Sequence, residues 1–125
     1  MSPAHELALY LQSEGVGTFG QDIHVSREPV SPGNVVTLYD TGGSAPANYD
    51  IELRQPTIQV RVRDVSYPAA QAKQEQIFGI LNDIKTQAIE GSTYLGVWMT
   101  TDILSIGRDD NDRHLLTANY QVQRG

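Results

Sequence analysis

The 125-residue sequence contains no cysteine, which excludes disulfide bonds, thiol nucleophiles and thiolate metal sites. No apolar run approaches the roughly 20 residues that a membrane-spanning helix needs. The N-terminus also lacks the basic start and apolar stretch of a secretion signal. We therefore expect a soluble protein of a reducing compartment that is held together by packing or assembly and has no membrane partner.

Basic residues are scarce. Nine Lys and Arg against 15 Asp and Glu give a formal net charge of -6. Affinity for nucleic acid comes largely from Lys and Arg that neutralise phosphates, so this balance argues against tight DNA binding. Hydrophobic residues make up 39% of the chain, an ordinary share for a globular protein, and the length suits one domain over residues 1–125.

Hydrophobic periodicity predicts two helices and five strands. Ser2 and Pro3 suit the start of a short helix, and Ser66 suits the start of a helix of about five turns that Gly91 closes. Alternating or β-branched stretches predict strands over residues 21–26, 34–39, 57–63, 94–104 and 114–123. The predicted fold class is α+β, a mainly antiparallel sheet of four to five strands with two helices packed on one face.

The stretch from about 40 to 55 is small and polar, and it has no period long enough for a helix or strand. Loops longer than about 12 to 15 residues are uncommon in compact domains, and they are usually functional or disordered until something binds them. We expect a long loop here that points toward a partner.

No catalytic or cofactor-binding constellation is evident. The glycines near residues 15–20 lead into a strand pattern, and Gly42 and Gly43 are not followed by a phosphate-binding lysine. The three histidines, His5, His24 and His114, lie in separate elements without the spacing of a zinc site. We therefore assign no catalytic residues, no cofactor and no metal ligands.

The acidic run at residues 109–112 is the best candidate for a metal site, because its alternate oxygens resemble a calcium-binding loop. That loop requires a glycine and a glutamate where this chain has His114 and Tyr120. The alternative is that the Asp and Asn side chains bond to the backbone of their own turn.

Arg61 and Arg63 lie on the polar face of the 57–63 strand. Such a face is normally solvated, but arginine is also enriched at subunit interfaces, where the acidic residues of this chain would supply partners. We treat Arg61, Arg63, Arg108, Asp109 and Arg113 as a candidate subunit or partner interface. Tyr94 and Trp98 are expected to fill the core or an interface.

Three stretches together resemble the minor capsid or tail terminator proteins of long-tailed bacteriophages and prophages. They are Ile58 to Asp64 with Tyr67 and Ala70, Ile77 to Ile84, and Ile106 to Asp109 leading through Arg113 into Leu116 to Val122. The similarity runs from about Gln55 to the C-terminus. The turn after Arg108 is more acidic than the family pattern, and the 40–55 loop is of a variable kind, so no specific contact is carried over for it.

The resemblance implies a structural virion protein with no enzymatic activity. It implies a subunit that forms a homohexameric ring, caps the tail tube and joins it to the neck connector at the head–tail joint. DNA would pass through without specific binding, and the protein would be made in the cytoplasm of the bacterial host. A net charge of -6 per copy agrees with a channel that repels phosphate.

Two other functions remain open from the residues. A neck or head completion protein could share this fold and ring habit. A small calcium-binding or ligand-binding module that uses the acidic turn is more remote.

Overall fold

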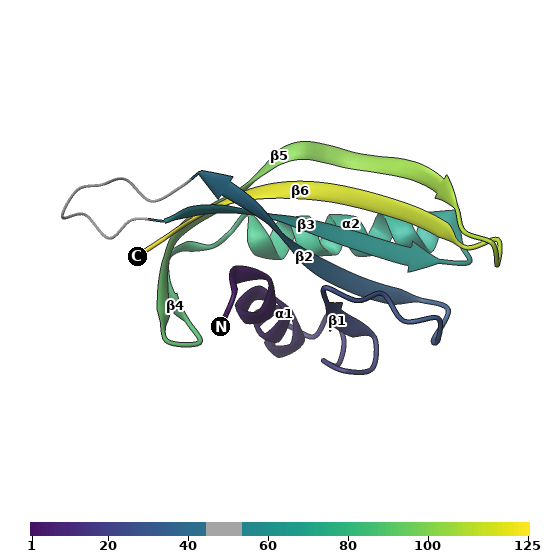
Figure 1. The fold of residues 1–125 in the computed structure, drawn as a ribbon, viewed down its shortest axis with the longest axis horizontal. Helices are drawn as coiled ribbons and strands as arrows, with labels where there is room; N and C mark the ends of the chain where they lie inside the picture. The colour runs from purple at the N-terminus through teal and green to yellow at the C-terminus, as the bar shows by residue number, and fades with distance from the viewer. Residues whose placement is uncertain (45–53) are drawn as a thin grey trace.

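A computed structural model describes residues 1–44 and 54–125 of the chain (Figure 1). Its helices and strands are α1 (Pro3–Ser13), β1 (Ile23–Val25), β2 (Val35–Ser44), β3 (Gln55–Asp64), α2 (Tyr67–Leu81), β4 (Lys85–Ile89), β5 (Ser92–Arg108) and β6 (His114–Arg124).

The strands form one curled sheet in the order β1-β2-β3-β6-β5-β4 (Figure 1). The α+β class is confirmed, but the predicted count of four to five strands is wrong, since the described residues form six. The sheet is also mixed, because β1 pairs with β2 in parallel while the other pairs are antiparallel.

Both helices contribute to one hydrophobic cluster with the sheet. The start of α1 is as predicted: Ser2 Oγ accepts a hydrogen bond from the His5 amide, which satisfies one of the free amides of the first turn. Leu7 and Leu11 of α1 pack in this cluster with alternate residues of β3, such as Ile58 and Val60. The buried stripes of the sequence therefore fix which face of each element points inward.

The second helix is shorter than predicted. It ends at Leu81, and residues 85–89 form β4 instead of two further turns. The cause is the pair Glu90 and Gly91, whose φ angles of 50° and 84° suit a two-residue hairpin turn that pairs Ile89 with Ser92. Ile84, which continued the predicted helical stripe, is still buried just before β4, whereas Ala88 is exposed and Ile89 is the buried residue of the strand.

The parallel pairing of β1 was not predicted. Its register places Ile23 beside Val36 and Val25 beside Leu38. Parallel strands need a return connection between them, and residues 26–34 provide it. The sequence analysis predicted strands over residues 21–26 and 34–39 but not how they pair.

The predicted loop at about 40–55 is wrong at its ends. Residues 40–44 belong to β2 and Gln55 begins β3, while residues 45–53 lie outside the described part of the chain. The register of β2 on β3 shifts between Asp40 and Gly43. Gly43 has a φ of 101°, and a Cβ atom there would lie 2.4 Å from the carbonyl oxygen of Gln55. Only glycine fits this close approach of the two strands.

The longest strand, β5, has one partly open side. β4 pairs with it only as far as Gly96, so from Val97 to Arg108 it has β6 on one side and no described strand on the other. Its register with β6 is interrupted three times within this stretch, between Met99 and Arg108. This half of β5 is the longest open strand edge of the described sheet.

Neither α1 nor α2 has the length and apolar character required to cross a membrane.

Candidate functional site

The predicted residues Arg61 and Arg63 lie together on β3, and both contact Glu28. Arg61 Nε is 2.9 Å from Glu28 Oε2, and Arg63 Nη1 is 3.4 Å from Glu28 Oε1. Arg61 is partly exposed, whereas Arg63 is only 2% exposed. The polar face of β3 is thus covered at this end by residues of the same chain.

Arg63 and Arg113 hold the return connection of residues 26–34 in place. Arg63 Nη2 donates to the Pro32 carbonyl oxygen at 2.7 Å, and its Nε donates to that of Gly33 at 3.4 Å. Arg113, which is 8% exposed, donates to the carbonyl oxygen of Val30. A guanidinium can serve several carbonyls at once because its donors form a rigid fork. The arginine side chains therefore bond to backbone carbonyls that would be paired with amides in a regular helix or strand.

The remaining predicted residues form the turn between β5 and β6. Asp109 Oδ1 accepts hydrogen bonds from the amides of Asn111 and Arg113, and Asp109 Oδ2 lies 2.7 Å from Arg113 Nε. Arg108 pairs with Asp112 at 2.9 Å, and both side chains are largely exposed. The carboxylate of Asp109 thus stabilises its own turn, which was the alternative to a calcium site. Among residues 1–44 and 54–125, no three His, Asp or Glu side chains are grouped to hold a metal ion.

We expect the Asp109→Asn substitution to weaken folding more at neutral pH than in acid. Burial alone would raise the pKa of Asp109, but hydrogen bonds from the backbone and side chain of Arg113 outweigh it and lower that pKa below its ordinary value. The stabilisation is therefore present above the unfolded-state pKa of about 4 and is lost as the pH falls through the folded-state value. Urea unfolding of both proteins at pH 7 and at about pH 3 measures it.

The control for this prediction is Asp110→Asn, a change at an exposed neighbour in the same turn. A difference in stability between wild type and Asp109→Asn that is equally large at both pH values would contradict the role of the charge.

A buried polar network at Glu6 was missed by the sequence analysis. Glu6 is 2% exposed and accepts hydrogen bonds from Ser92 Oγ at 2.7 Å and Tyr94 OH at 2.8 Å. It also forms an ion pair with Arg124. Burial, together with the hydrogen bond to Glu6, raises the pKa of Tyr94 above its ordinary value. The network joins α1 to β5 and β6. The one signal in the sequence for a buried Glu6 is its position next to Leu7, a residue of the buried helical stripe.

The three histidines remain apart. His5 stacks on Phe19 with 5.1 Å between ring centroids, and His114 packs edge-on against Tyr67 at 5.4 Å. His24 Nε2 lies 2.9 Å from the carbonyl oxygen of Gln21.

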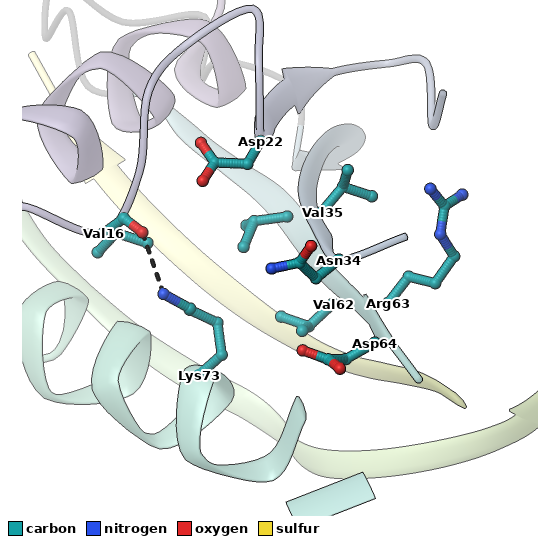
Figure 2. Close-up of a pocket in the computed structure, with 9 residues that line it drawn as sticks. Val16, Asp22, Asn34, Val35, Val62, Arg63, Asp64 and Lys73 are labelled. Carbon is teal, nitrogen blue, oxygen red and sulfur yellow. Dashed lines mark hydrogen bonds between the residues drawn. The ribbon is translucent and has the colours of Figure 1, made fainter. Parts of the chain in front are cut away.

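A small crevice lies where α2 faces β2, β3 and the end of α1 (Figure 2). Lys73 extends from α2 and donates to the Val16 carbonyl oxygen at 3.1 Å, while Asp22 and Asp64 line other parts of the wall. Its volume is about 40 Å³. Pockets that bind small molecules are usually several hundred Å³, so this crevice is too small for a typical small-molecule ligand.

Large apolar side chains are exposed along β5. Leu95, Trp98, Leu104 and Ile106 are between 41% and 54% exposed. Tyr94 is fully buried, as one of the predicted alternatives required, whereas Trp98 is at the surface. Exposed apolar residues that gather on one element mark an interaction surface more often than scattered ones do.

A sequence model of the bacteriophage tail terminator protein family matches residues 10–124. The chain belongs to this family. The resemblance found in the sequence is thereby confirmed, and this tail terminator protein is a structural protein of the phage tail and a component of the virion. A search of curated proteins finds no match.

Two solved structures share the fold of this tail terminator protein. One comes from a study titled as the virion of a native gene transfer agent particle; it has a TM-score of 0.65 and 14% identity, and the alignment covers 97% of this chain and 94% of the other. The second, whose title names no activity, has a TM-score of 0.52 and 17% identity over 95% of this chain and 89% of the other. These likenesses support the α+β fold over nearly the whole chain.

Proposed function

We propose that this tail terminator protein forms a homohexameric ring that caps the tail tube and joins it to the neck connector at the head–tail joint. The observation that carries the proposal is the family match over residues 10–124. The long open side of β5, with its exposed apolar residues, supports an assembled state because a free subunit leaves this surface uncovered.

The charge of the chain suits a channel for DNA. Six copies at -6 each carry -36, so the ring repels phosphate and lets DNA pass without holding it. The partners in this proposal are other copies of the chain, the tube protein and the neck protein, and the protein is made in the host cytoplasm.

The predicted interface residues contribute in two ways in this proposal. Arg61 and Arg108 keep exposed parts of their side chains beside their ion pairs with Glu28 and Asp112. In the ring, these exposed parts are expected to contact acidic residues of neighbouring subunits. Arg63, Asp109 and Arg113 are engaged within the chain, and they position the segment and the turn that neighbours meet. Charge reversal by Arg108→Glu should lower the assembled fraction at a given concentration, as measured by light scattering, while an unchanged fraction would remove Arg108 from the interface.

The mass of the purified chain, measured by light scattering over a range of concentrations, tests ring formation. A species of six subunits is expected, and a ring with another number of subunits would correct the copy number.

In phage particles, we expect the protein at the end of the tail. Its presence on heads made by a tailless mutant would instead favour the neck or head completion function.

A further inference from the structure

A hollow of about 250 Å³ lies between α2 and the open half of β5. It is lined by Glu75 and Phe78 of α2 and by Met99, Asp102 and Ile103 of β5. The register of β5 shifts on both sides of Thr101, next to the hollow. Such irregularities bend a strand and redirect its side chains, and they are common beside binding sites.

The chemistry of the lining suits a long basic side chain. The lining combines two acidic residues, Glu75 and Asp102, with the apolar side chains of Phe78, Met99 and Ile103. Arginine and lysine bind in this way, with the aliphatic stem on apolar surface and the cation on acidic groups.

A buried hydroxyl without a partner lies on the same face of the sheet as the hollow. Tyr120 is fully buried, and its hydroxyl has no hydrogen-bond partner among the described residues. Tyr120 lies opposite Met99 in the β5–β6 register, so both side chains project to the same face. Burial, followed by the charges of Glu75 and Asp102, raises the pKa of Tyr120.

The chain itself offers one basic residue in a suitable place. Five of its nine Lys and Arg form ion pairs within the described residues, and Lys73 donates to the Val16 carbonyl oxygen. The remaining three are Arg27, Arg54 and Lys85, all of which are exposed. Lys85 lies on β4, where it pairs with Gly96 of β5, and Arg54 directly precedes β3, in the middle of the strand order. Only Arg27 lies at the opposite end, just after β1.

We propose that the hollow receives the Arg27 side chain of a second copy of this chain, so that the β1 end of one subunit docks on β5 of the next. β1 is at one end of the strand order and β5 is next to last at the other, and a contact between different surfaces of identical subunits closes into a ring when the rotation allows it. Val30, 76% exposed in the same segment as Arg27, adds an apolar group that matches the exposed Leu104 and Ile106. This inference rests on the proposed ring.

Charge reversal and charge exchange test the contact. Arg27→Glu and Asp102→Arg should each raise the concentration needed for half-maximal assembly by about tenfold or more, because each places like charges together. The double variant Arg27→Glu with Asp102→Arg should restore assembly toward the wild-type concentration. The matched controls are Arg54→Glu and Glu14→Arg, which make the same charge changes at other exposed residues and should assemble like wild type.

Cross-linking supplies a second measurement that does not depend on the strength of the contact. Because the chain has no cysteine, Arg27→Cys with Asp102→Cys creates one reactive pair. A short bis-maleimide should join this double variant into a ladder of covalent oligomers, whereas either single variant should stop at dimers.

The outcomes separate this inference from the proposed function. If wild type assembles but Arg27→Glu assembles equally well, or the exchanged pair restores nothing and no ladder forms, the contact is wrong and the ring stands. If wild type stays monomeric up to about 1 mM, where even weak association is visible, both the contact and the self-assembled ring are overturned.

Discussion

Replacement of Glu6 by alanine is expected to lower the free energy of unfolding by about 3 kcal/mol or more. The change removes the carboxylate on which Arg124, Tyr94 and Ser92 converge, and it leaves an arginine beside a buried site without its partner. Loss of one member of a buried ion pair typically costs about 3 to 5 kcal/mol. Urea unfolding followed by circular dichroism measures the effect.

Two variants separate the network from the helix that carries it. Glu14→Ala, at an exposed site at the end of α1, should change stability by no more than about 0.5 kcal/mol. Glu6→Gln keeps an acceptor but loses the charge, so it should fall between Glu6→Ala and wild type. A Glu6→Ala protein as stable as Glu14→Ala would show that the network contributes nothing net.

The Arg63→Ala substitution should cost about 3 kcal/mol and release the segment of residues 26–34. Arg63 is buried and supplies hydrogen bonds to backbone carbonyls of this segment, besides its contact with Glu28. Its removal leaves acceptors and a carboxylate without their donor, which is among the larger effects a single change can have. Relative to wild type, the variant should show a larger increase in amide hydrogen exchange in β1 than in β3, because β1 depends on this connection.

The conservative change Arg63→Lys should rescue little of the lost stability, because an ammonium group cannot reproduce the planar fork of donors. Arg54→Ala removes an exposed arginine next to β3 and serves as the control. Equal exchange rates in the β1 amides of wild type and Arg63→Ala would contradict the role assigned to this side chain.

The sequence predicted best the elements whose signals are local. Ser2 and Pro3 mark the start of α1, and alternation along β3 and β6 gives the buried face of each strand, because these patterns depend only on the period of the element. β4 was missed because Ile84 and Ala88 continue the helical spacing of α2. The two-residue turn at Glu90 and Gly91 instead lets residues 85–89 pair with β5 as a strand.

The candidate site was less accessible to sequence analysis because its contacts join distant residues. Arg63 alternates with buried valines and therefore belongs to a polar face, and nothing near it indicates that residues 30–33 cover that face. Glu6 and Arg124 are 118 positions apart. Such pairs follow from the order of strands in the sheet, which local periodicity does not contain.

The irregular register of the open half of β5 also affects the protein before assembly. A long, flat and apolar strand edge templates the addition of further chains and leads toward fibrils, but three interruptions between Met99 and Arg108 and the charge of Asp102 break the even ladder that such growth needs. A single subunit with this edge bare is thus protected against indiscriminate strand addition.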